Sequence, residues 1–324
     1  MAGHFAGVTR AGAASGAPTA EKFKELREGL KALPYDYWDS MDRVFSTYRY
    51  VAQPLSSVVL GAIREAGISR IEVFCSGAHF DYASSEAVRD LAGWLDERGL
   101  ELHSMHSPTQ RDTGGRHEGG LPISISDGER VRRLDAVDEV KRAIDVAERI
   151  PFKYLVQHLG SSRQSADPRF IDAAFNSLEH LAIFAKQRGV TIALENTPNE
   201  LGAPLTLVNF IKETHLNDLR FCLDVGHAHI EGGIASAFET MRERLVTTHI
   251  HDNHGDEDEH LLPFEGTIDW DATLQMIADA PQALPIVIEL KEHATQSEVL
   301  HRARAAFDRI ENELESKRAR AAER

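Results

Sequence analysis

Short β-rich runs alternate with longer amphipathic runs along most of this chain, and this alternation restricts the folds that it can adopt. The strands are predicted over residues 44–50, 70–75, 100–106, 153–158, 190–195, 219–224, 245–251 and 285–290. Strands that alternate with helices pair in parallel, and eight such units close into a barrel that has no exposed edge. The pattern therefore predicts an α/β fold, the (β/α)8 TIM barrel.

Helical runs lie between these strands, and local signals mark some of their ends. They are expected over residues 56–65, 86–98, 129–149, 169–188, 205–215 and 296–317. Three glycines stand where a helix passes into the next strand, as glycine commonly does after a helix C-terminus: Gly67, Gly99 and Gly189. Asp269, directly before Trp270, is expected to cap the seventh helix.

Residues 1–42 precede the predicted barrel. The first twenty are mostly Ala, Gly, Ser and Thr without a periodic apolar pattern, so we expect a disordered tail there. Apolar residues then recur at helical spacing before Pro34, namely Phe23, Leu26, Leu30 and Leu33. We therefore expect a short N-terminal helical extension within 1–42, followed by one barrel domain over 43–324.

Composition narrows the classes of function. The chain has 324 residues, of which 36 are Lys or Arg and 51 are Asp or Glu, giving a net charge of −15. Such a balance argues against a general nucleic-acid or membrane-surface protein and suits one that collects cations. No apolar run is long enough for a membrane span and no leader pattern is found, so we expect a cytoplasmic protein. Cys75 and Cys222 are expected to be buried free thiols.

The stretch from His249 to His260, HIHDNHGDEDEH, is especially dense in histidines and carboxylates. It holds four histidines and five carboxylates in twelve residues, directly after the apolar residues of the seventh strand. A solvated acidic loop can have this composition. However, carboxylates this close repel one another unless a cation lies between them, and a divalent metal removes that conflict.

Similar residues end nearly every other predicted strand. In a TIM barrel the chemistry lies at the C-terminal ends of the strands. Those ends and the loops after them carry His106, His158, Glu195, Asp224, His227, His249, His251, Asp258, His260 and Glu289. One strand-end histidine or glutamate is more often structural, but several buried together without a partner are costly. We therefore predict a metal site, and this mixed donor set favours zinc, manganese or cobalt over magnesium.

With these motifs, over roughly residues 43–306, the sequence resembles the xylose-isomerase-like TIM barrels. That superfamily includes sugar and sugar-phosphate isomerases and epimerases and the endonuclease IV repair enzymes. The resemblance implies a shared metal core of Glu195, Asp224, His249 and Glu289. Endonuclease-type members hold three zinc ions with nine ligands, and the matching residues here are His106, His158, Glu195, Asp224, His227, His249, Asp258, His260 and Glu289. Sugar-isomerase-like relatives of unassigned substrate also carry versions of this pattern, so it does not by itself indicate phosphodiester cleavage.

The preferred hypothesis is a metal-dependent isomerase or epimerase of a sugar or sugar phosphate, with one to three ions. Glu195 and Glu289 would move a proton through an enediolate, since they end strands five and eight on opposite sides of the ring. In related epimerases the equivalent glutamates are both ligands and proton carriers. The expected substrate contacts are His227, His251, Glu72, His79 and Lys291. Glu72 is equally consistent with a buried structural carboxylate, and His79 and Lys291 with plain loop charges.

Two other functions stay open. One is zinc-dependent cleavage of abasic DNA in the manner of endonuclease IV. The loops at the expected mouth carry only Arg111, Arg116, Arg163 and Lys291 against fourteen acidic residues, which favours a small neutral substrate over DNA. The other is a barrel that binds a metal or sugar without catalysis. The long loop 107–128, with Arg111, Arg116 and His117, has the length of a lid or specificity loop. The sequence leaves open the sugar, the metal and whether the protein forms a homo-oligomer.

Overall fold

A computed structural model of the chain describes residues 41–111, 120–161, 164–291 and 296–322. The chain divides into two units, Met1–Ser40 and Met41–Arg324. The tail and short helix that we expect before residue 41 lie outside the described residues.

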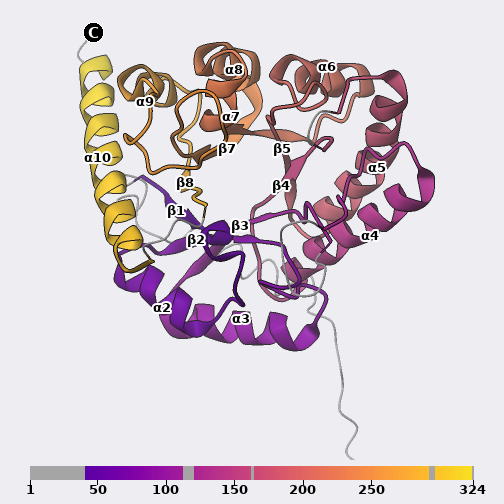
Figure 1. The fold of residues 1–324 in the computed structure, drawn as a ribbon, viewed down its shortest axis with the longest axis horizontal. Coiled ribbons are helices and arrows are strands. Elements are labelled where there is room, and N and C mark those ends of the chain that lie inside the picture. Colours follow the sequence, from indigo (N-terminus) through magenta and orange to yellow (C-terminus); the bar gives the residue numbers. More distant parts are fainter. Residues whose placement is uncertain (1–40, 112–119, 162–163, 292–295, 323–324) are drawn as a thin grey trace, which may run out of the picture. The chain divides into compact units, whose positions relative to one another are not determined.

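Eight parallel strands form a closed barrel in which neighbours in the sequence are neighbours in the sheet, and the last strand pairs with the first (Figure 1). The TIM-barrel prediction is therefore confirmed. The strands are β1 (Arg43–Ser46), β2 (Arg70–Phe74), β3 (Glu101–His106), β4 (Tyr154–His158), β5 (Thr191–Glu195), β6 (Arg220–Asp224), β7 (Leu245–Ile250) and β8 (Ile286–Ile288).

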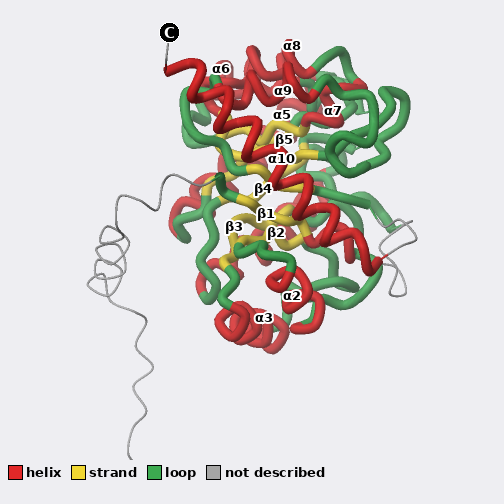
Figure 2. Tube along the Cα trace, turned by 90° about the vertical axis from the view of Figure 1, so that its left-hand side faces the viewer, coloured by secondary structure: helices red, strands yellow, loops and turns green. Residues whose placement is uncertain are grey.

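Helices surround the barrel, with the strands inside (Figure 2). They are α2 (Ser57–Glu65), α3 (Ser85–Arg98), α4 (Arg130–Asp145), α5 (Pro168–Gln187), α6 (Pro204–Thr214), α7 (Val225–Ile230), α8 (Ile234–Met241), α9 (Trp270–Ala278) and α10 (Gln296–Ala322). Short 3-10 helices are η3 (Thr47–Tyr50), η4 (Val146–Glu148) and η5 (Arg242–Arg244). All six helical runs expected from the sequence are present.

Two predicted elements end four residues earlier than expected. The first strand stops at Ser46, and the prediction of strand over residues 47–50 is wrong, because these residues form η3. The Ser46 side chain accepts a hydrogen bond from the backbone N–H of Tyr48, which turns the chain out of the sheet. The helix expected over 129–149 ends as an α-helix at Asp145 and continues as η4.

The predicted helix-end signals have the expected geometry. Gly67, Gly99 and Gly189 have φ of +83°, +62° and +75°, a left-handed conformation that glycine adopts without strain. Asp269 caps α9, since its carboxylate accepts the backbone N–H of Ala272 at 3.1 Å. The three glycines thus mark where a helix ends before the next strand, and Asp269 marks where α9 begins.

Apolar side chains fill the layer between strands and helices, while the barrel interior combines small apolar and polar groups. Val156, Ala193 and Cys222 form a separate buried cluster. Cys222 and Cys75 are buried and free, as expected. Among the helices that the structure describes, none combines the length and apolar character needed to cross a membrane.

Candidate metal centre

The chemistry-bearing residues lie in one layer at the C-terminal end of the barrel. His106, His158, Glu195 and Asp224 are the last residues of β3, β4, β5 and β6. Strand register aligns them, because His158 pairs with Glu195 and Asp224 pairs with His249. Parallel strands of equal register end at one level, so short local runs of sequence deliver their final side chains to one mouth.

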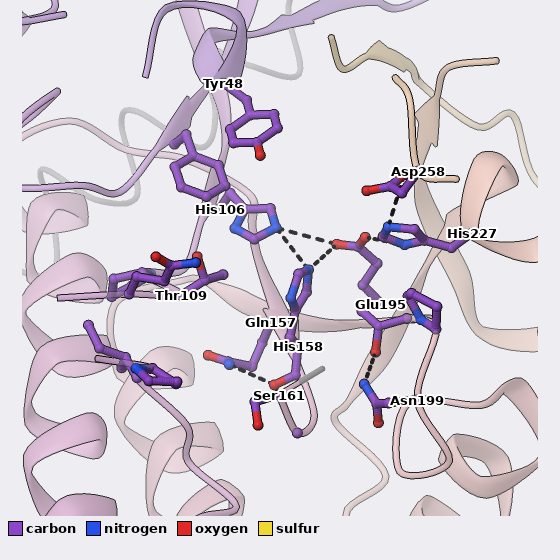
Figure 3. A pocket seen from close by; sticks show the side chains of 18 of the residues that line it. Tyr48, His106, Thr109, Gln157, His158, Ser161, Glu195, Asn199, His227 and Asp258 are labelled. Carbon is purple, nitrogen blue, oxygen red and sulfur yellow. Dashed lines mark hydrogen bonds and ion pairs between the residues drawn. The ribbon is translucent and has the colours of Figure 1, made fainter. Parts of the chain in front are cut away.

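Glu195 lies at the centre of this layer, where histidines surround its carboxylate (Figure 3). Its Oε2 is 3.2 Å from His158 Nε2, 3.3 Å from His249 Nδ1 and 3.4 Å from His106 Nε2. Its Oε1 is 3.2 Å from His227 Nδ1. Both oxygens of this carboxylate therefore lie beside imidazole nitrogens.

His249 joins Glu195 to two further carboxylates. His249 Nδ1 lies 3.5 Å from Glu289 Oε2 and 3.8 Å from Asp224 Oδ2. All four side chains are buried. The residues that the resemblance implied as a shared metal core thus converge from β5, β6, β7 and the residue after β8.

The loop after β7 closes a further group around Asp258. Asp258 Oδ2 is 3.0 Å from His260 Nε2, and Asp258 Oδ1 is 3.7 Å from His227 Nε2. The ring of His251 stacks on that of His260 at 3.9 Å. His227, His251, Asp258 and His260 each offer a ligand atom, and all of these atoms lie within 4.8 Å of one another.

Several polar side-chain atoms of this site are buried without a hydrogen-bond partner among the residues that the structure describes. They are Glu195 Oε1, His249 Nδ1, His251 Nδ1, Asp258 Oδ1 and Glu289 Oε1. Each buried polar atom left unsatisfied costs about 1–3 kcal/mol. Carboxylate oxygens and imidazole nitrogens facing one another in this way are the donor set of zinc and manganese. The residues therefore fit a divalent cation.

Burial and crowding shift the pKa values of these groups. Burial raises the pKa of Glu289 to about 7, and repulsion from Glu195 and Glu72 adds to this despite two nearby imidazoles. Burial also acts to raise the pKa of Glu195, but the surrounding imidazoles outweigh it and hold that pKa well below its usual value. Conversely, burial acts to lower the pKa of His227 and His249, and neighbouring acids raise both well above the usual value. A network of opposite charges results.

A cavity of about 340 Å³ opens onto the site. Glu195, Glu289 and His227 line it, together with His106, His158, Asp258 and His260. Tyr48 lies on one side of the cavity and the polar residues Gln157 and Asn199 lie on the other (Figure 3). Phe74 also lines the cavity, and its ring lies 4.7 Å from that of Tyr48. Ligand and substrate groups can therefore meet at one mouth.

The other predicted substrate contacts are not among the described residues that line the cavity. His79 is buried beneath η3, with Nδ1 2.7 Å from the carbonyl of Gln53 and Nε2 3.0 Å from Thr47 Oγ1. Glu72 and His251 are buried behind the cavity rather than among its described lining residues. Lys291 donates to Asp258 Oδ2 at 2.9 Å, so it approaches the site through a metal-ligand candidate.

Sequence reasoning missed the aromatic wall. Phe74 is the last residue of β2, so the strand-end rule that found the histidines applied to it as well, whereas Tyr48 lies in the unexpected turn η3. The described parts of the long loop lie at the mouth as expected, since the cavity lining includes Pro108, Thr109, Gln110, Pro122 and Ile123. Arg111 pairs with Asp135 and Glu139 of α4. Arg116, His117 and Arg163 of the expected basic set lie outside the described residues.

Comparison with known proteins agrees with this architecture. An uncharacterized protein of Sinorhizobium fredii, y4fM, is 29% identical over 286 residues, which cover 81% of this chain and 91% of that protein. A probable endonuclease 4 of Haloarcula marismortui is 25% identical over 177 residues, covering 48% of this chain and 63% of its own length. The crystal structure of a D-tagatose 3-epimerase-like protein superposes with a TM-score of 0.70 at 23% identity, covering 87% of this chain and all of that one.

A family model described as "Xylose isomerase-like TIM barrel" matches residues 60–312. That span includes β2 to β8 and every candidate ligand named above. The first relative carries no assigned activity, and the solved structure shares the fold. On the extent of this match, the chain belongs to the xylose isomerase-like TIM barrel family.

Proposed function

We propose that this protein is a divalent-metal-dependent isomerase or epimerase of a small hydroxyketone, a keto-sugar or a related polyol. One observation carries the proposal. Two glutamates, Glu195 and Glu289, reach the same cavity from different strands, and both approach the same imidazole, at 3.3 and 3.5 Å. Moving a proton between adjacent carbons of a hydroxyketone needs two such carriers beside an electrophile.

The disposition of the two glutamates differs from a simple opposition across the ring. β5 and β8 are separated by two strands on one side of the barrel and by four on the other. Their carboxylates therefore face the cavity from converging directions, with His249 between them. One carboxylate can take a proton from a carbon while the other, in its protonated form, donates its own proton to the opposite face of that carbon or to the neighbouring carbon.

Glu195, Asp224, His249 and Glu289 would hold the metal. A divalent cation there polarises a carbonyl and stabilises the negative charge that develops on its oxygen. His227, which lines the cavity beside Glu195, would hydrogen-bond a substrate hydroxyl. Burial of these groups excludes water from the proton-transfer path.

The cavity lining favours an uncharged, polyhydroxylated substrate. Tyr48 and Phe74 offer apolar ring surfaces, and Gln157 and Asn199 offer amides that both donate and accept hydrogen bonds. Among the described residues that line the cavity there is neither lysine nor arginine. Phosphate recognition relies mostly on these two residue types and on backbone amides, so the lining supports an alcohol-rich substrate rather than a polyanion.

The test is isotope exchange. The metal-loaded protein is incubated with a panel of ketoses in deuterated water, and we expect deuterium to enter the carbon next to the carbonyl of at least one of them. Glu195→Gln and Glu289→Gln should each abolish this exchange with an unchanged circular-dichroism spectrum. Glu213→Gln, on the exposed face of α6, is the matched control and should exchange as the wild type does.

A second function, phosphodiester cleavage at abasic DNA, is favoured by one observation. The described residues include five overlapping groups that could hold a metal ion, and Glu195 belongs to three of them, including the one with His106 and His158 and the one with Asp224 and His227. Clustered cations can generate hydroxide and stabilise a leaving oxygen. An abasic-site duplex is therefore assayed in parallel. Strand nicking without deuterium entry into any sugar would replace the isomerase proposal.

A further inference from the structure

We propose that Glu72 is the positioning residue that orients His249 for metal binding. The inference rests on the proposed metal centre and assigns to Glu72 a role other than the substrate contact expected from the sequence. The two nitrogens of the His249 ring face different partners. Nδ1 faces Glu195 and Glu289, while Nε2 lies 3.2 and 3.3 Å from the two carboxylate oxygens of Glu72.

The approach of Glu72 to His249 depends on barrel closure. Glu72 lies on β2 and His249 on β7, 177 residues apart in the chain. Two strands, β1 and β8, separate them in the sheet, so the contact crosses the interior of the barrel. Both side chains have no exposed surface. Glu72 therefore reaches the metal centre from beneath, away from the cavity.

A second contact fixes the Glu72 carboxylate. Ser104 Oγ donates a hydrogen bond to Glu72 Oε2 at 2.8 Å. The pairing of β2 with β3 shifts register after Ile71, which places Glu72 opposite Ser104 and brings the hydroxyl beneath the carboxylate. A buried carboxylate that is held by one hydroxyl and one imidazole has few alternative rotamers.

The contact with Glu72 selects one tautomer of His249. A carboxylate at Nε2 requires a proton on that nitrogen, which leaves the lone pair of Nδ1 directed at Glu195 and Glu289. Carboxylates in this place orient a metal-binding imidazole and increase its basicity, and their loss costs roughly 10–100-fold in metal affinity or activity.

The experiment measures Zn²⁺ affinity of the full-length protein by competition with a chelator. Glu72→Gln preserves the shape of the side chain and removes its charge, and we expect Zn²⁺ to bind roughly 10–100-fold more weakly. Ser104→Ala removes the hydroxyl under the carboxylate and should give a smaller loss in the same direction. Thr247→Val, an isosteric change of another buried hydroxyl two residues before His249, should bind as the wild type does.

A spectroscopic readout separates orientation from general destabilisation. With Co²⁺ at saturation, the visible spectrum of Glu72→Gln should differ from that of the wild type, and the spectrum of Thr247→Val should not. Zn²⁺ affinity of Glu72→Gln within threefold of the wild type, or an equal loss in Thr247→Val, would overturn the role of Glu72. If Glu72→Gln does not fold, Ser104→Ala decides: a Zn²⁺ affinity no weaker than that of Thr247→Val would overturn the role of Glu72. Failure of the wild type to bind Zn²⁺ would instead overturn the metal centre itself.

Discussion

Gly226 gives the sharpest single test of the packing that holds this site together. It is the second residue of α7, and a Cβ built on it would lie 1.9 Å from Cε1 and 2.4 Å from Nδ1 of His251. Carbon atoms in contact stay about 3.5–4.0 Å apart, so in Gly226→Ala the imidazole has to move by roughly 1.6–2.1 Å. The site thus depends on the absence of one methyl group.

The surroundings of His251 prevent such a movement at low cost. The ring is fully buried, its opposite face stacks on His260 at 3.9 Å, and its Nε2 lies 3.1 Å from Asp224 Oδ1. Overpacking costs about 1–3 kcal/mol, and a lost hydrogen bond to a charged group about 1.5–3 kcal/mol. We therefore expect Gly226→Ala to lower the free energy of unfolding by roughly 2–5 kcal/mol, allowing for overlap between the two effects.

The assay compares two glycine-to-alanine changes by thermal unfolding and Zn²⁺ binding. Gly93 lies on the exposed side of α3 with nothing within 4 Å of an added Cβ, so Gly93→Ala should stabilise the protein by about 0.5–1 kcal/mol through helix propensity. Gly226→Ala should lower the midpoint of unfolding, at roughly 2–4 °C per kcal/mol, and weaken Zn²⁺ binding. A midpoint and affinity unchanged in Gly226→Ala would refute the reasoning, because alanine is otherwise the better helix former.

Three further predictions concern the same region. The pKa values of His227 and His249 are raised, so the metal-free protein carries protons on these histidines that Zn²⁺ binding must release. Zn²⁺ affinity should therefore fall as the pH is lowered. Calorimetry in buffers of different ionisation enthalpy should show net proton release on binding, and proton uptake would contradict this. Asp252 is fully buried and accepts the indole N–H of Trp270 at 2.7 Å, so Asp252→Ala should lower the free energy of unfolding by about 1–3 kcal/mol or more. It should also raise the rate of amide hydrogen exchange in the loop after β7, and the exchange of Asn253→Ala serves for comparison. Asp269→Ala removes the α9 cap and should cost about 0.5–2 kcal/mol in urea unfolding without changing Zn²⁺ affinity.

The predicted barrel and the observed one agree closely because both depend on short-range information. Strand and helix periods, helix caps and the glycines after helices are each set by a few consecutive residues. The one clear error in the strands, residues 47–50, arose where a serine side chain competed for the backbone. Residue type alone did not distinguish that turn from a continuing strand, since Tyr48 and Tyr50 suit either.

Strand-end position predicted that Glu195, Asp224, His249 and Glu289 would gather at one mouth, because parallel strands of a closed barrel present their last residues at one level. The choice of these four as a metal core came from the family resemblance. Strand-end position did not distinguish candidate metal ligands from residues that position those ligands. Glu72 lies in the interior of β2 and contacts His249 only through the lumen. No local sequence pattern predicts a contact between residues that lie this far apart in the chain.

The sequence by itself determined the fold class and the identity of the groups that crowd the mouth, since both follow from periodicity and from which residue ends each strand. Only the tertiary structure decided that Tyr48 and Phe74 form a cavity wall, that Glu72 contacts His249 and that Gly226 leaves room for His251. The physical reason is that these relations are distances between side chains on different strands, and they depend on register, on the β2–β3 shift and on barrel closure, which act together over the whole chain.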